Sequence, residues 1–229
     1  MSADYKYSIL KDILAVKIAN KKVWKDRIRN QTHFLHLLED VFGTDISNES
    51  FGFYPKRIYF ATSLTADPKY TKSMMPYWHK IIKAIEKLDW TVYSPFDQSN
   101  PHSKIPDGLD SYQIRDLDHI NVLKSEAALM DLNRPSHGVG QEIEMGLSVP
   151  KIGFSQEKVS RMVKGMPGIL VLNYKDEKEL ISLLKKIFQR TSYKKEPFYI
   201  EKCSEHSTKS IFKGEICLNC EFDSYIHKV

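Results

Sequence analysis

The sequence predicts an α/β fold built on a five-stranded parallel sheet. Between residues 57 and 190, short apolar segments alternate with segments of helical periodicity, a pattern typical of parallel strands that are covered on both faces. Right-handed crossovers favour the strand order 2-1-3-4-5, with a switch point between the first and third strands. Ligands of such sheets bind at the carboxyl ends of the strands beside that point.

The elements follow in a regular order along the chain. Apolar segments predict strands at 57–62, 90–93, 126–132, 150–154 and 168–172. Helical periodicity predicts helices around 70–88, 111–124, from 138 onward, 156–164 and 176–190. Residues 94–110, which contain three prolines and a glycine, are expected to form a long loop. The turns after the first and third strands should face each other above the sheet.

Two further segments flank this sheet. Apolar residues at helical spacing predict an N-terminal extension of two helices over residues 1–50, which is expected to cap the sheet or to make a dimer contact. The sheet domain is expected over 56–192, and a small C-terminal segment over 198–229. These boundaries follow the changes in residue pattern along the chain.

The composition excludes several classes of protein. The 229 residues are 41% hydrophobic and 28% charged, as in soluble globular proteins. No apolar run approaches the ~20 residues of a membrane helix, and the first residues lack the layout of a signal peptide, so an intracellular protein is expected. The net charge of +5 comes from lysines spread along helices, which favours a solvated surface over a nucleic-acid groove.

The segment from Ala127 to Glu142 carries the clearest functional pattern. It predicts a buried strand, a polar turn, Gly138 and Gly140, and a helix with a glutamate in its first turns. A helix start above a parallel sheet presents free backbone N–H groups, and glycines there let a ligand approach the backbone. Because Ile143 replaces the third glycine of a dinucleotide-binding fingerprint, and no Walker phosphate loop is present, the pattern does not favour a cofactor loop.

Two carboxylates are candidates for catalysis. Glu142 and Glu144 flank the apolar face of this helix on opposite sides; Glu142 is nearer its ligand-facing start, and Glu144 remains the rival. On the preceding helix, Asp118 falls within the apolar stripe, where a carboxylate is costly unless it is paired or functional. A partly buried Asp can act as an acid, and an Asp–Glu pair is the arrangement that cleaves glycosidic bonds.

The segments Tyr59–Ser63, Asp118–Ile120, Pro135–Glu142 and Lys158–Gly165 resemble the nucleoside 2-deoxyribosyltransferase superfamily. They look most like its branch of 2'-deoxynucleoside 5'-monophosphate N-glycosidases. The resemblance spans residues 57–188 and implies an enzyme that acts on nucleotides or nucleosides as a homodimer. The Ser-x-Gly-x-Gly-x-Glu element is its most specific motif.

The resemblance also implies residue roles. Glu142 would be the nucleophile, Asp118 the acid that assists departure of the base, and Tyr59 the residue that holds Glu142. Contacts to the sugar and the 5'-phosphate would come from Ser63, Ser136, Gly138, Gly140 and Ser160, with Ser160 reaching a neighbouring subunit. Two positions depart from the family pattern: Glu144 replaces a small residue, and Thr65 stands where an arginine is common.

Ser136 bears on the choice of substrate. The transferases of the family tend to carry an acidic residue at this position, which would repel a phosphate. A serine can instead donate a hydrogen bond to it. The sequence therefore favours hydrolysis of a nucleoside 5'-monophosphate, with base exchange between nucleosides as one alternative. A nucleotide-sensing or adaptor protein is the other.

All three cysteines lie in the C-terminal segment. Cys203-x2-His206, followed by Cys217-x2-Cys220, is a Cys3His spacing typical of a structural Zn2+ site. His227 is the alternative to His206 as a ligand. A segment this small would need the metal to fold. It could bind nucleic acid, a protein partner or the parent domain.

Overall fold

The computed structural model describes residues 54–64, 68–98, 111–146, 149–189, 198–206 and 209–225. The predicted N-terminal helices and His227 lie outside these residues. The sheet domain contains β1 Tyr54–Ala61, α4 Pro68–Glu86, β2 Thr91–Tyr93, α5 Pro95–Gln98, α6 Ser111–Lys124, β3 Ser125–Asp131, α7 His137–Met145, β4 Lys151–Ser155, α8 Arg161–Lys164, β5 Ile169–Asn173 and α9 Glu177–Gln189. Among the helices of the described ranges, none is both long and apolar enough to cross a membrane.

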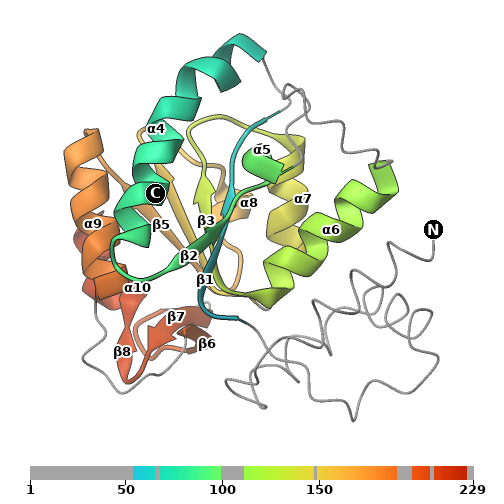
Figure 1. Ribbon diagram of the computed structural model, residues 1–229. Coiled ribbons are helices and arrows are strands. Elements are labelled where there is room, and N and C mark those ends of the chain that lie inside the picture. The colour runs from blue at the N-terminus through green and yellow to red at the C-terminus, as the bar shows by residue number, and fades with distance from the viewer. Residues whose placement is uncertain are drawn as a thin grey trace, which may run out of the picture.

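The five strands form one parallel sheet in the order β2-β1-β3-β4-β5, which confirms the predicted fold class (Figure 1). β1 therefore lies between β2 and β3, and the chain reverses its direction of winding there. The carboxyl ends of β1 and β3 lie side by side in the register Ala61 to Met130. This is the edge at which a ligand site is expected.

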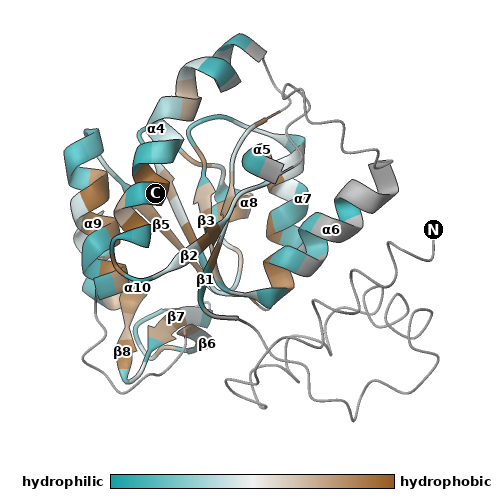
Figure 2. Cartoon of the chain, in the orientation of Figure 1, coloured by the Kyte–Doolittle hydropathy of each residue, from teal (hydrophilic) through white to brown (hydrophobic). Residues whose placement is uncertain are grey.

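Alternate residues of β1 point to two separate hydrophobic clusters. Ile58 and Phe60 of β1 point to the face that α4 and α9 cover, whereas Tyr59 and Ala61 point to the face of α6 and α7. Figure 2 shows α9 with its brown, apolar residues on the side of the sheet and its teal residues on the outer side. The position of Tyr59 in a period-two strand thus decides which helices its hydroxyl can meet.

Two predicted elements were wrong in detail. The helix expected over 156–164 begins only at Arg161, because the Ser155 hydroxyl accepts from Glu157 N and holds a tight turn there. The loop expected over 94–110 contains the short helix α5 at its start.

The C-terminal segment forms a second, smaller sheet. β6 Phe198–Lys202, β7 Lys209–Lys213 and β8 Ile216–Cys217 pair antiparallel in that order, and α10 Leu218–Glu221 and the 3-10 helix η2 Asp223–Tyr225 follow. Gly214, at a φ of 60°, provides the left-handed turn between β7 and β8. These elements, from β6 to η2, are called the ribbon below.

Candidate active site

Tyr59 and Glu142 meet between the sheet and α7. The Tyr59 side chain is fully buried, and its hydroxyl donates a hydrogen bond of 2.5 Å to Glu142 Oε1. The Tyr59 ring stacks on Tyr93 of the neighbouring strand, with centroids 5.6 Å apart. Burial, and then the Glu142 carboxylate, raise the pKa of Tyr59 well above its usual value. Tyr59 therefore remains protonated and can only donate to the carboxylate.

Asp118 of α6 is the second carboxyl group at this place. Burial raises the pKa of Asp118 to about 7, although the Tyr59 hydroxyl lowers it. Burial also raises the pKa of Glu142 to about 8; the Tyr59 bond lowers this pKa and the Asp118 charge raises it. Because the two carboxyl groups interact, their protons leave in two steps that belong to the pair. Near neutral pH the pair shares one proton, which suits acid–base chemistry.

Several buried polar atoms, in this pair and in the residues that follow β1 and β2, make no hydrogen bond within the described structure. Within the described part of the chain, Asp118 Oδ1 and Glu142 Oε2 make no hydrogen bond, and neither does Ser63 Oγ. Thr62 Oγ1 at the end of β1 and Ser94 Oγ after β2 are in the same condition. Buried polar atoms are normally satisfied, so a group of them at the carboxyl ends of two adjacent strands is typical of a polar ligand site.

The structure separates Glu142 from its rival. The Glu144 side chain is exposed on α7, while Glu142 turns its carboxylate toward Tyr59. The unsatisfied hydroxyls of Thr62 and Ser94, in contrast, were not predicted: Thr62 was named only within the Tyr59–Ser63 segment, and Ser94 was not singled out. A single hydroxyl at a strand end carries no periodic signal, and only the position of the strand end could have identified them.

The turn before α7 has the geometry of a helix start. The Ser136 hydroxyl accepts from Val139 N at 3.5 Å and caps the helix. A Cβ at Gly140 would meet nothing within 4 Å, and one at Gly138 would meet only the Ser136 hydroxyl at 3.7 Å. Neither glycine has a positive φ. The fold alone does not require glycine at either position, and the space beside Gly140 is open.

A network of hydrogen bonds, buried at Asp131, holds this turn in place. Asp131, at the end of β3, accepts hydrogen bonds from Trp78 Nε1 at 2.7 Å and from the side chain of Asn133 at 2.7 Å. The other end of the Asn133 amide accepts from Gln156 N at 2.8 Å, in the loop after β4. The loops after β3 and β4 are therefore tied to each other and to α4.

Ser160 lies in the loop after β4, on the surface. Its side chain is exposed, and its hydroxyl caps α8 by accepting from Met162 N at 3.2 Å. The structure thus brings Tyr59, Asp118 and Glu142 together, and it places Ser63 after β1 and Ser136 at the start of α7. It leaves Ser160 at an exposed helix start.

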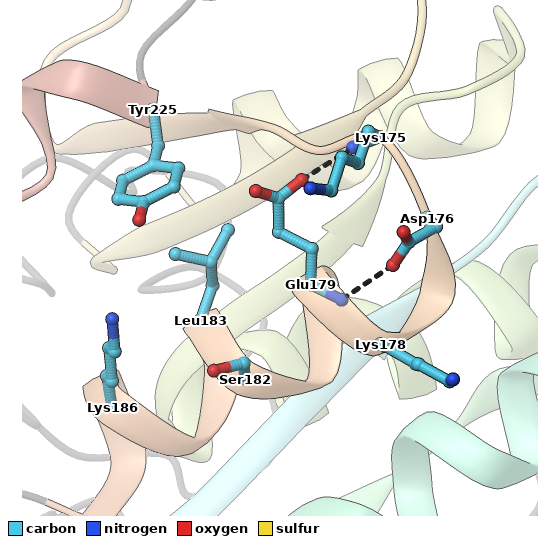
Figure 3. Close-up of a pocket in the computed structure, with 8 residues that line it drawn as sticks. All are labelled: Lys175, Asp176, Lys178, Glu179, Ser182, Leu183, Lys186 and Tyr225. Atoms are coloured by element: carbon cyan, nitrogen blue, oxygen red, sulfur yellow. Dashed lines mark hydrogen bonds between the residues drawn. The ribbon is translucent and has the colours of Figure 1, made fainter.

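A separate pocket of about 360 Å3 lies along α9 (Figure 3). At its upper end, Glu179 accepts from Lys175 N at 2.8 Å, and Asp176 accepts from Glu179 N at 2.9 Å, which caps the helix. The pocket contains none of the predicted site residues; it is lined by Lys175, Asp176, Lys178, Glu179, Ser182, Leu183, Lys186 and Tyr225. We assign it to the junction of α9 with the ribbon.

The four predicted metal ligands converge in the ribbon. The ligand atoms of Cys203, His206, Cys217 and Cys220 all lie within 4.8 Å of one another. Cys203 Sγ is 3.5 Å from Cys220 Sγ, which is 3.7 Å from His206 Nδ1. A disulfide would need about 2.05 Å, whereas Zn–S bonds of about 2.3 Å in a tetrahedron separate sulfurs by roughly 3.8 Å. This cluster can hold a metal ion.

The chain is a parallel α/β protein, and its carboxylate pair is a candidate ligand site beside the switch point of the sheet. The chain is similar to the structure of a CMP N-glycosidase from Clostridium botulinum, with 16% identity and a TM-score of 0.44, over 57% of this chain and 98% of that one. It is similar to a conserved protein from Enterococcus faecalis V583, with 21% identity and a TM-score of 0.43, over 57% and 98% of the two chains. A 2-deoxyribosyltransferase from Bacillus psychrosaccharolyticus is similar at 17% identity and a TM-score of 0.39, over 55% and 90%. No family model and no curated protein matches the chain.

Proposed function

We propose that the chain is an N-glycosidase of the nucleoside 2-deoxyribosyltransferase superfamily. It would hydrolyse the bond between base and sugar in a (2'-deoxy)nucleoside 5'-monophosphate. The observation that carries the proposal is the pair of buried carboxyl groups of Asp118 and Glu142. The Tyr59 hydroxyl donates a hydrogen bond of 2.5 Å to Glu142 Oε1. The motif resemblance supports the same assignment independently of the geometry.

In the first step, the ionised Glu142 carboxylate forms a bond to the anomeric carbon while the bond from that carbon to the base breaks. The base leaves with the electron pair and takes the proton of Asp118. The hydrogen bond from the Tyr59 hydroxyl stabilises the ionised form of Glu142, and Tyr59 lowers the pKa of Asp118 as well. This step therefore needs the proton that the pair shares to lie on Asp118. The product is a glycosyl ester of Glu142.

In the second step, Asp118, now ionised, takes a proton from water, and the water oxygen bonds to the anomeric carbon. Glu142 leaves as a carboxylate, and Asp118 is protonated again. The products are the free base and the sugar 5-phosphate. If a second base attacks in place of water, the same intermediate gives base exchange.

The 5'-phosphate would lie at the start of α7. Its N-terminal backbone N–H groups favour an anion, and the open space beside Gly140 leaves room for one. Ser63 and Ser136 would donate hydrogen bonds to the substrate. Ser160 would contribute to the site of a second copy in a homodimer, which fits its exposed position.

The test is mass spectrometry of a panel of nucleotides, deoxynucleotides and nucleosides after incubation with wild type and Glu142→Ala. Glu144→Ala is the matched control, because Glu144 lies two residues along the same helix with its side chain exposed. We expect free base from a monophosphate with wild type and with the control, but none with Glu142→Ala. Base release that survives Glu142→Ala would exclude the assignment.

The same panel separates the alternatives. Transfer of the sugar to an added free base, with nucleosides as substrates, would favour a deoxyribosyltransferase. Tight nucleotide binding without turnover, unchanged in Glu142→Ala, would favour a sensing or adaptor protein.

A further inference from the structure

The ribbon shares its hydrophobic core with the sheet domain. Its buried residues Phe198, Ile211, Leu218 and Phe222 belong to the cluster that fills the α4 and α9 face of the sheet. The Phe198 ring lies 5.8 Å from Trp90 and 6.0 Å from Phe188, centroid to centroid. Figure 3 shows Tyr225 of η2 above Leu183 of α9. The ribbon therefore completes a core that the sheet domain begins.

Hydrogen bonds join the ribbon to the backbone of the sheet domain at the amino end of β5. Gly168 N donates to Lys209 O at 2.8 Å, and the Asn219 side chain donates to Ile169 O while accepting from Ile211 N, each at 3.0 Å. Gly168 has a φ of +67°, and a Cβ there would lie 2.2 Å from Ile200 Cδ1. Glycine is required at this position because the ribbon packs directly on the backbone.

A buried carboxylate joins three strands at the same end of the sheet. Glu126, at the start of β3, accepts from Lys56 N of β1 at 2.7 Å and from Phe198 N of β6 at 3.2 Å. The Lys213 ammonium of β7 lies 4.4 Å from the centre of the Phe198 ring and 5.1 Å from that of Trp90. The ribbon is thus anchored at the amino ends of the strands, whereas the substrate site faces their carboxyl ends.

The ribbon has little internal structure with which to hold this shape. β8 is two residues long, and α10 is a single turn. Cys203 and His206 follow β6, while Cys217 and Cys220 lie at the end of β8 and in α10, so an ion would join the two ends of the ribbon. With all four positions filled by protein ligands, such a site is structural rather than catalytic.

We propose that Cys203, His206, Cys217 and Cys220 bind one Zn2+, and that this ion stabilises the whole sheet domain through the ribbon. The ribbon is then an internal support of the fold. This inference is independent of the reaction proposed above, since metal content and unfolding are measured without substrate.

The test uses the full chain in wild-type form and the variants Cys220→Ser and Ser204→Ala. Ser204 is the matched control, because it lies between two ligands and its exposed hydroxyl bonds only to Glu205 in the described structure. Metal content is measured by elemental analysis, and unfolding by calorimetry before and after treatment with a strong chelator and after addition of ZnCl2. Hydrogen exchange follows the amides of Gly168, Ile211 and the central strands.

We expect one Zn2+ per chain in wild type and Ser204→Ala, and less than a tenth of this in Cys220→Ser. Zn2+ at about a thousand times its dissociation constant shifts the folding equilibrium about a thousandfold, which raises the melting temperature of a domain of this size by roughly 8–16 °C. Chelation should lower it by a similar amount, expose the central strands to exchange, and be reversed by ZnCl2.

Three results would overturn the proposal. The first is wild type without stoichiometric zinc. The second is a mass two units low, from a disulfide. The third is a chelated protein in which only ribbon amides exchange faster and the melting temperature is unchanged. If Cys220→Ser does not fold, the chelation series on wild type still decides between these results and the expected one.

Discussion

Glu142 should destabilise the protein at the pH at which it works, and replacing it by glutamine should reveal this. The side chain is partly exposed as a whole, but its Oε2 atom is buried, and within the described chain nothing hydrogen-bonds to that atom. Burial raises the pKa of Glu142 from 4.5 to about 8. The amide of Glu142→Gln keeps an oxygen that can accept the Tyr59 hydrogen bond and removes the charge.

The direction in which stability changes with pH follows from proton binding by Glu142 in the folded and unfolded states. A carboxyl group whose pKa is raised on folding contributes stability that is fully present below pH 4.5 and is lost as the pH rises through about 8, because the folded state holds the proton more tightly. At 1.36 kcal/mol per pKa unit, the shift from 4.5 to about 8 corresponds to at most about 5 kcal/mol. Since the proton is shared with Asp118, about 2–4 kcal/mol is the expected gain for Glu142→Gln at pH 8.

The assay is urea unfolding of the full chain at pH 5, 6, 7 and 8, without substrate. Glu142→Gln should match wild type within about 1 kcal/mol at pH 5 and exceed it increasingly toward pH 8. Glu144→Gln, on the same helix but exposed, should follow wild type throughout. Equal stabilities of Glu142→Gln and wild type at pH 8, or a difference that does not change with pH, would refute the burial of this charge.

Three further outcomes follow from the site. Tyr59→Phe removes the hydroxyl that lowers the pKa of both Asp118 and Glu142. The bell-shaped pH profile of kcat/KM should therefore move up by about one pH unit, and activity at pH 7 should fall about 10-fold or more. A profile that is lowered but not shifted would contradict this. Gly140→Ala should stabilise α7 by up to about 1 kcal/mol, measured by urea unfolding. It should nevertheless raise KM about tenfold, because the added methyl group would occupy the open space proposed for the substrate phosphate. An unchanged KM would mean that no substrate lies there. Asn133→Ala should cost about 1–3 kcal/mol of unfolding free energy and raise KM, and a loss of stability with unchanged kinetics would show that this residue does not position the turn.

The pattern of the sequence predicted the sheet because its signal is repeated. Each strand is a short apolar run, and each helix shows its period over several turns, so the elements, including the bounds of α6, followed from local rules. The order 2-1-3-4-5 followed from the right-handed crossovers that connect parallel strands. Asp118 was found for the same reason: it interrupts a regular stripe. The boundary at Arg161 was missed because a side-chain bond of Ser155 determines it, and no periodicity reports that bond.

The candidate site was predictable only in part. Glu142 and Glu144 are equivalent by helical period, and the choice depends on Tyr59, which is 83 residues away in the chain. The unsatisfied hydroxyls of Thr62 and Ser94 were not predicted, because they depend on where two neighbouring strands end. The packing of the ribbon on the sheet domain could not be predicted from the sequence. It depends on the Ile200 side chain lying against the backbone of Gly168, where any larger residue would clash, and no sequence pattern reports such a contact.

The groups at the two ends of the sheet have opposite effects on the stability of the fold. At the carboxyl ends, the buried carboxyl groups of Asp118 and Glu142 reduce stability as they ionise, and the proposed reaction needs Glu142 in its ionised form. At the amino ends, the ribbon adds Phe198 and Ile211 to the core and joins β1 to β6 through Glu126. Sites that share no partners contribute to stability nearly additively. A metal bound in the ribbon would therefore offset the destabilisation by the carboxylate pair without changing the pKa values of the pair. Removal of zinc should lower the melting temperature and leave the pH profile of the remaining folded enzyme unchanged.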